Sequence, residues 1–430
     1  MLSNVLQSLG QTLSSIYLGR FLGPQALAAS GNLFPIIFLM ISFMMGLASA
    51  TNVLIGQAHG AGDEQRVKTV AGTSLGIGII GGALVGVLCA LFSEPLLRLI
   101  GTPADIFATS LLYARTMFVS LPLLFAFLLY STCMRGMGDS RLPFYFLVLY
   151  TAMQMLVTPA LIFGWLGLPR IGVLAAAWGT IVASLVTLSV VIFTLRAMRS
   201  PLALGQIAHA LVPRGRLVLT LLRIGLPTGT QLILISLAEI AVISFVNRFG
   251  SNATAAYAAV NQITSYVQFP AISIGIAASI FGAQSIGAGR VDRLRKVVHA
   301  SVAMNYVLEG ALILIVYVFA NWILGLFLTS ESTHEIARAL LNITLWSYAI
   351  FGNAAVISGI VRSSGDVLFP TAIAVASIWL IEVPVAWYLS HRIGLAGVWY
   401  GYPAAYIVNL FAQFAYYELV WRRKPLRALR

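Results

Sequence analysis

The sequence contains very little charge: 9% of its 430 residues are Asp, Glu, Lys or Arg, whereas 59% are hydrophobic. Soluble domains carry roughly 25% charged residues, because water has to solvate their surface. The low charge therefore excludes an ordinary soluble fold. Instead, apolar runs of about 20 residues, each long enough to cross a bilayer as a helix, recur along the chain. The composition predicts a multi-pass membrane protein.

Groups that carry catalytic or metal chemistry are also scarce. The two cysteines, Cys89 and Cys133, fall inside predicted spans, so we expect no disulfide framework. The five histidines lie far apart and lack the spacing of metal ligands. No nucleophile–base pair and no polar catalytic loop is evident, which disfavours a membrane enzyme. We expect no metal site and no cofactor.

The net charge of +13 comes from Lys and Arg in the short connections between apolar runs. This placement is typical of topology control and of attraction to anionic lipid headgroups, rather than of nucleic-acid binding. Connections on one side of the predicted membrane, together with the C-terminal tail, hold 19 of the 26 basic residues. The positive-inside rule then predicts that both termini lie in the cytoplasm, with the chain in the inner (plasma) membrane.

The apolar runs predict an all-α fold of twelve transmembrane helices. The predicted spans are 1–22, 32–57, 69–93, 107–134, 143–164, 172–197, 224–248, 259–285, 297–326, 336–361, 368–390 and 396–421. The longest polar interruption separates the sixth span from the seventh. We therefore expect an N-terminal six-helix lobe at 1–200, a cytoplasmic linker at 201–222 and a C-terminal six-helix lobe at 223–430.

An internal repeat relates the two predicted lobes. Residues 57–62 (QAHGAG) recur at 284–289 (QSIGAG), a displacement of 227 positions. The same displacement carries Arg135, Gly138, Asp139 and Pro143 to Arg362, Gly365, Asp366 and Pro370. Because each copy holds an even number of spans, the repeats are parallel, and two such bundles enclose a cleft that can open to either side. The first copy is short at its start, which favours a true start upstream of Met1.

Three carboxylates, Glu239, Glu309 and Glu382, fall well inside apolar spans. An ionised carboxylate in hydrocarbon costs at least about 2.5 kcal/mol, so such residues usually face a cavity and bind ions or substrate. We expect Glu239 and Glu382 to couple ions, the latter beside a helix irregularity at Pro384. For Glu309, which has Asn305 close by in the sequence, a buried structural pair and a functional role both stay open.

Other polar residues have competing interpretations. Gln231 lies two turns from Glu239, and Asn261, Gln262 and Tyr266 cluster in one span. These side chains are candidates for substrate binding, although hydrogen bonding between helices explains them equally well. Gly78, Gly82 and Gly86, spaced four apart, indicate a helix packing face. Asp139 and Asp366 are expected to cap the following helical turns.

Several motifs resemble those of multidrug and toxic compound extrusion (MATE) exporters. They are residues 17–29 (YLGRFLGPQALAA), 56–62 (GQAHGAG), 135–139 (RGMGD) and 225–227 (GLP). The resemblance covers nearly the whole chain. It implies twelve helices in two lobes, with export driven by the entry of protons or sodium ions.

The chain departs from the family at its coupling positions. The helix 1 aspartate of many members corresponds to Ser14, and the helix 7 glutamate of the NorM-like branch corresponds to Ile235, one turn before Glu239. The helix 10 aspartate of that branch falls near Phe351, which leaves Asn353 as a neighbouring candidate for substrate binding.

The sequence therefore predicts a monomeric secondary antiporter that exports organic, cationic or amphiphilic compounds in exchange for protons or sodium. The alternative is a lipid-linked saccharide flippase of the same superfamily. Such flippases commonly have extra helices and a basic cavity, whereas the charges inside the spans here are acidic. The substrate and the coupling ion stay open at this stage.

Overall fold

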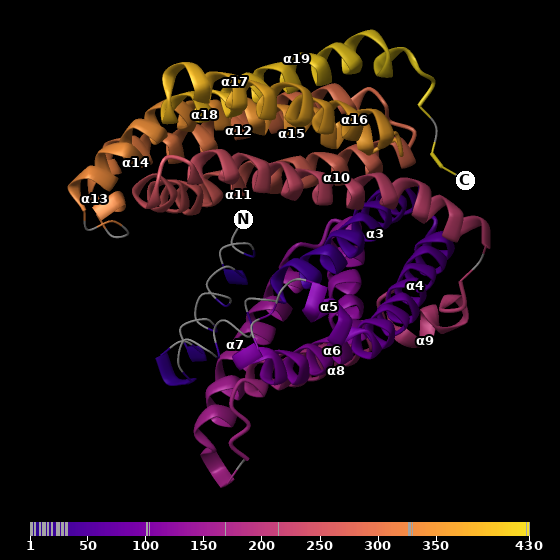
Figure 1. The fold of residues 1–430 in the computed structure, drawn as a ribbon. Helices are drawn as coiled ribbons and strands as arrows, with labels where there is room; N and C mark the ends of the chain where they lie inside the picture. The colour runs from indigo at the N-terminus through magenta and orange to yellow at the C-terminus, as the bar shows by residue number, and fades with distance from the viewer. Residues whose placement is uncertain are drawn as a thin grey trace. The chain divides into compact units, whose positions relative to one another are not determined.

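A computed structural model describes residues 33–430 apart from positions 100, 101, 103, 168, 214, 326, 327, 329, 427 and 430. Before residue 33 it describes only positions 3, 6, 7, 10, 14, 17, 18, 20–22, 26 and 30. The chain forms two compact units, Leu2–Leu226 and Pro227–Arg430 (Figure 1). We refer to them as the N-terminal unit and the C-terminal unit.

The described part of the N-terminal unit is helical. Its elements are α3 (Phe34–Gly60), α4 (Glu64–Leu91), α5 (Ser93–Leu99), α6 (Ala104–Gly136), α7 (Arg141–Phe163), η1 (Trp165–Gly167), α8 (Leu174–Ala197), α9 (Leu204–Ile207), η2 (Ala208–Ala210) and the start of α10 (Gly215–Asn247). Helix α6 lies at the centre of this unit, where it packs against α3, α4 and α8.

The C-terminal unit continues from Pro227 inside α10. Its further elements are α11 (Ser251–Gly287), α12 (Arg293–Val318), α13 (Ala320–Gly325), α14 (Glu331–Thr344), η3 (Leu345–Ser347), α15 (Tyr348–Arg362), α16 (Leu368–Ser377), η4 (Ile378–Glu382), α17 (Val383–Ile393), α18 (Leu395–Trp399), α19 (Gly401–Leu419) and η5 (Trp421–Arg423). Helix α15 lies at the centre, where it packs against α11, α12 and α19.

The helices coincide with the predicted spans. Every predicted span from 32–57 onward falls on one helix or on consecutive helices, whereas the span 1–22 lies mostly outside the described residues. Ten helices of the described chain are long and apolar enough to cross a membrane. Helix α19 is not among them, and it carries four tyrosines together with Asn409, Gln413 and Glu418. The prediction of an all-α fold is confirmed.

The internal repeat is visible in the backbone. Gly62 and Gly289, which are 227 positions apart, have φ angles of 71° and 69°, and Gly138 and Gly365 have φ angles of 93° and 88°. L-residues rarely adopt such angles, so glycine is needed at each of these turns. In both copies the N–H of the turn glycine donates to the carbonyl three residues earlier. The predicted repeat therefore describes two copies of one backbone design.

The two repeat aspartates differ in their contacts. Asp139 Oδ1 accepts the backbone N–H groups of Arg141 at 2.9 Å and Leu142 at 3.2 Å, so the predicted cap is correct. Asp366 provides no such cap, and the prediction was wrong there. Its Oδ2 instead accepts Tyr416 Oη–H at 2.6 Å and Lys424 Nζ–H at 2.8 Å, and this bond raises the pKa of Lys424. The carboxylate ties the C-terminal segment to the unit.

Small residues allow close helix contacts, as predicted for α4. A side chain at Gly82 would meet the Pro122 backbone of α6 at 3.1 Å, and one at Gly86 would overlap the Phe118 carbonyl. Helices α11 and α15 meet in the same way, because a side chain at Gly275 would lie 3.1 Å from the Ala355 carbonyl. Close backbone approach gives van der Waals contact that larger side chains would prevent.

The segment predicted as a linker is partly ordered. Within 201–222 the structure has the short elements α9 and η2 followed by the first turns of α10. Element η2 packs against α4, and Thr73 Oγ1 donates to the Ala210 carbonyl at 3.4 Å. The segment is therefore attached to the N-terminal unit rather than extended.

Candidate functional site

Glu239 and Glu382 are brought together in the C-terminal unit. Glu239 is exposed on α10, whereas Glu382 is 4% exposed at the end of η4. The two carboxyl groups are close enough for their charges to interact. An electrostatic interaction thus links two acidic residues that are more than a hundred positions apart in the sequence, and we refer to them as the pair.

The local backbone positions Glu382. Residues Ile378–Glu382 form a π-helical turn, in which Val383 N–H donates to the carbonyl of Ile378 five residues earlier. Pro384 follows directly and has no N–H to continue the α-helical pattern. Trp379 Nε1–H donates to the Leu234 carbonyl at 3.2 Å and so joins this turn to α10. The irregular turn is thereby held beside the helix that carries Glu239.

Four tyrosines lie within electrostatic range of Glu382. The hydroxyl oxygens of Tyr257 on α11 and Tyr402 on α19 lie 3.2 Å apart. Tyr257 and Tyr406 are within electrostatic range of both carboxyl groups. The Tyr406 ring packs against Tyr348, with ring centroids 5.6 Å apart. We call Glu239, Glu382, Tyr257, Tyr348, Tyr402 and Tyr406 the carboxylate–tyrosine cluster.

These tyrosines were not among the site residues predicted from the sequence. Tyrosine is common in membrane helices, where its ring is apolar and its hydroxyl polar, so a single tyrosine carries little signal. The i, i+4 spacing of Tyr402 and Tyr406, which places both on one face of α19, was the available sign.

Gln231 belongs to a different network. Its Oε1 accepts a hydrogen bond of 2.6 Å from the Arg362 guanidinium, which also donates to Thr228 Oγ1 at 3.2 Å and Thr371 Oγ1 at 3.3 Å. This residue, expected to bind substrate, is thus engaged in hydrogen bonds between α10, α15 and α16.

The remaining candidates are exposed or make other contacts. Asn261 and Gln262 are exposed on α11, and Tyr266 is half-buried with its ring edge-on to Phe269 at 5.7 Å. Asn353 on α15 is 4% exposed, and its Oδ1 accepts a hydrogen bond from Asn305 on α12 at 3.4 Å. Among the described residues, no group of three or more His, Cys, Asp or Glu side chains could hold a metal ion.

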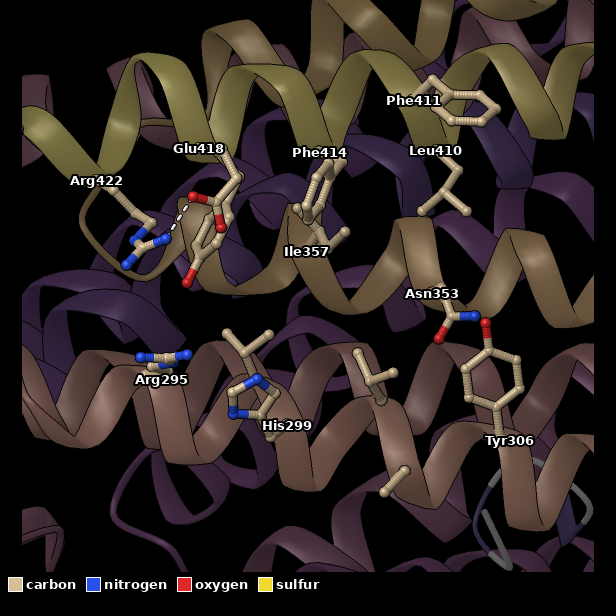
Figure 2. A pocket seen from close by; sticks show the side chains of 14 residues that line it. Arg295, His299, Tyr306, Asn353, Ile357, Leu410, Phe411, Phe414, Glu418 and Arg422 are labelled. Carbon is tan, nitrogen blue, oxygen red and sulfur yellow. Dashed lines mark hydrogen bonds and ion pairs between the residues drawn. The ribbon is translucent and has the colours of Figure 1, made fainter.

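A groove of about 700 Å³ runs between α12, α15 and α19 (Figure 2). Arg295 and the Arg422–Glu418 ion pair lie at one end, and Asn353 and Tyr306 lie at the other. Apolar side chains line the middle. A smaller apolar pocket of about 210 Å³ lies between α3, α4 and α6 in the N-terminal unit.

Comparison with known proteins gives one consistent result. A family model described as MatE matches residues 1–160 and 227–388, one segment in each half of the chain. The chain belongs to the MatE family. This confirms the resemblance seen in the sequence, and it makes the protein a multi-pass membrane transporter rather than an enzyme.

Individual relatives are consistent with membership of this family. "Probable multidrug resistance protein YoeA" of Bacillus subtilis is 46% identical over 432 residues, covering 100% of this chain and 93% of the relative. "Probable multidrug resistance protein YpnP" of the same organism is 26% identical over 97% of this chain and 92% of its own length. A crystal structure of a mutant of the Vibrio cholerae MATE transporter VcmN has a TM-score of 0.90 at 24% identity, covering 99% of this chain and 95% of that chain. The similarity to this crystal structure shows the fold alone.

Proposed function

We propose that the protein is a secondary antiporter that exports organic, cationic or amphiphilic compounds in exchange for protons or sodium ions. Membership of the MatE family and the names of its relatives as multidrug resistance proteins support the class of substrate. The observation that carries the proposal is the hydrogen bond that joins the turn of Glu382 to α10, the helix of Glu239, with the two carboxyl groups within electrostatic range of each other.

The electrostatics of the pair suit exchange. Two negative charges in an apolar unit repel each other, and a proton, a sodium ion or an organic cation bound there relieves this repulsion. The tyrosine rings beside the pair can add a cation–π attraction of about 0.5–2 kcal/mol for an organic cation. Because one positive charge relieves most of the repulsion, the coupling ion and the substrate compete for one place. Such competition is the basis of antiport.

Transport also requires two conformations. A bound ion shifts the equilibrium between outward-open and inward-open states only if it binds them with different affinity. We assign the two states to a cleft between the lobe at 1–200 and the lobe at 223–430, joined by the segment 201–222. A neutralised carboxylate pair removes the cost of closing an apolar cleft around a charge. In our proposal the protein is a monomer in the inner membrane with both termini in the cytoplasm.

The first prediction tests the carboxylates. We expect Glu239→Gln to abolish gradient-driven efflux, because a neutral amide cannot exchange a cation, and Glu382→Gln to weaken it. The measurement is efflux of a fluorescent organic cation from proteoliposomes, driven separately by a proton gradient and a sodium gradient. The gradient that drives efflux by the wild-type protein identifies the coupling ion.

The matched control for this experiment is Glu335→Gln, because Glu335 is an exposed carboxylate on α14, outside the cluster. It should transport like the wild-type protein. Efflux is normalised to the amount of protein in the membrane. Near-normal, gradient-dependent efflux by Glu239→Gln would remove this residue from the mechanism.

A further inference from the structure

Glu309 lies in the interior of the C-terminal unit and makes no ion pair with any residue that the structure describes. The residue is 0% exposed on α12, and neither of its carboxyl oxygens has a hydrogen-bond partner within the described part of the chain. A buried polar group without a partner is rare in native proteins, and for a carboxylate the cost is several kcal/mol. A positive occupant would remove this cost.

Asn305 supplies a further acceptor beside this carboxyl group. Asn305 lies one turn before Glu309 and is also 0% exposed. Its Nδ2 donates to the Ala349 carbonyl at 3.3 Å and to Asn353 Oδ1 at 3.4 Å. Because a carbonyl oxygen can only accept, the Ala349 contact fixes which end of the amide is Nδ2. Asn305 Oδ1 then has no partner among the residues that the structure describes.

Gly352 on α15 leaves the space that these oxygens occupy. A Cβ atom at this position would overlap Glu309 Oε2 and the Asn305 amide. The carboxyl and amide oxygens therefore lie together against the bare backbone of Gly352. Next to them, Asn353 Oδ1 accepts one hydrogen bond and keeps a second lone pair. The Ala349 carbonyl already accepts from both Asn305 Nδ2 and Asn353 Nδ2.

We propose that Glu309, Asn305 and Asn353 form a sodium site between α12 and α15. Hard cations take oxygen ligands, and three acceptor oxygens without a donor match this chemistry. A proton on Glu309 would pair one carboxyl oxygen with Asn305 Oδ1 and leave the other oxygen alone. A divalent ion would leave a buried positive charge, because the site holds one carboxylate.

One residue of the proposed site, Asn353, lines the groove between α12, α15 and α19. Asn353 is both a wall of the groove and a hydrogen-bond partner of Asn305 (Figure 2). From Arg295 to Tyr306 the groove follows α12 for eleven residues, a rise of about 16 Å. The proposed site therefore adjoins the groove at Asn353.

This site is separate from the carboxylate–tyrosine cluster, and its test requires no transport. The full chain is purified in detergent, and its melting temperature is measured as NaCl replaces choline chloride at constant ionic strength. Ligand binding to the folded state stabilises it in proportion to ln(1 + [Na⁺]/Kd). We expect a stabilisation by sodium that rises with the logarithm of its concentration above Kd, and none by potassium at the same concentrations.

Variants then locate the ion. Glu309→Gln should abolish the sodium response, and Gly352→Ala should weaken the apparent affinity by about 10–100-fold, the usual effect of disturbing a metal site. Gly310→Ala is the matched control, because a Cβ at Gly310 would meet nothing within 4 Å. Size-exclusion profiles establish that each variant is folded. If Glu309→Gln is unfolded, the apparent sodium affinities of Gly352→Ala and Gly310→Ala are compared, and this comparison tests the site.

The outcomes separate this proposal from the proposed function. Sodium binding that survives in Glu239→Gln and Glu382→Gln but not in Glu309→Gln supports the new site, whatever efflux shows. An unchanged sodium response in Glu309→Gln, an equal response to potassium, or no response of the wild-type protein overturns it. Loss of the response in Glu239→Gln alone assigns sodium to the carboxylate–tyrosine cluster and also overturns the new site.

Discussion

At the scale of single residues, Arg362 shows how a charge is accommodated in an apolar unit. Its guanidinium donates to Ser358 Oγ at 3.1 Å as well as to Thr228, Gln231 and Thr371, and it makes no ion pair with any carboxylate that the structure describes. The five N–H groups of arginine suit such an arrangement of neutral acceptors. The bond to Gln231 Oε1, at 2.6 Å, has the short length typical of charge-assisted hydrogen bonds.

Arg362 therefore carries a prediction about stability. Arg362→Ala should lower the free energy of unfolding by about 1–3 kcal/mol, because Gln231 Oε1 and the neighbouring hydroxyls lose their donor. The measurement is the melting temperature in detergent. Arg338→Ala, at an exposed position on α14, should leave it nearly unchanged. Equal melting temperatures of the two variants would show that the network contributes little to stability.

At the scale of elements, the π-helical turn Ile378–Glu382 matters most. A regular α-helix would join Val383 N–H to the carbonyl of Trp379, whereas here it bonds to that of Ile378. Such turns occur frequently at functional sites, because they change the direction of one side chain within a helix. The side chain in question is Glu382, a member of the carboxylate–tyrosine cluster.

We expect Pro384→Ala to convert this turn to α-helix. The new N–H can donate to the Leu380 carbonyl, which restores the α-helical pattern and turns Glu382 by up to about 100°, the rotation per residue in an α-helix. Gradient-driven efflux should fall to the level of Glu382→Gln, while the melting temperature stays equal or rises. The measurements are efflux from proteoliposomes and thermal melting.

The control for the turn is Leu380→Ala, at a side chain 70% exposed within the same turn. This substitution leaves the backbone hydrogen bonds in place, so efflux should stay near that of the wild-type protein. Wild-type efflux by Pro384→Ala would show that the position of Glu382 does not depend on the π-helical turn.

At the scale of the whole molecule, two copies of one design carry different chemistry. The copies share their turn glycines, yet Glu239, Glu309 and Glu382 all belong to the C-terminal unit. The counterparts under the 227-residue displacement are Thr12, Gly82 and Met155. The shared backbone therefore does not require the carboxylates, which is expected for groups retained for ion and substrate binding.

The prediction at this scale concerns the membrane topology, that is, the side of the membrane on which each connection lies. In a chain whose Cys89 and Cys133 are replaced by alanine, cysteines at the exposed positions Gly205 and Pro425 should react with a membrane-impermeant maleimide only from the cytoplasm. Cysteines at Arg170 and Arg392, also exposed, should react only from outside. Labelling of Gly205→Cys and Pro425→Cys from opposite faces would contradict an even number of spans between them.

The sequence by itself determined the membrane class, the positions of the helices and the repeat. Hydrophobicity is a local property, so a run of apolar residues indicates a span without knowledge of its neighbours. The turns at Gly62 and Gly289 were also predictable in kind, because a left-handed backbone needs glycine. Family membership followed from these motifs.

The tertiary structure decided which polar groups meet. Gln231 and Glu239 lie on the same helix. Packing nevertheless places Gln231 in a hydrogen bond with Arg362, and Glu239 within electrostatic range of Glu382. Likewise, Asn305 lies on the same helix as Glu309, but only the contact with α15 places Gly352 and Asn353 beside Glu309 and Asn305. The rotation and depth of each helix are set by close packing over its whole length, and no local pattern in the sequence specifies them.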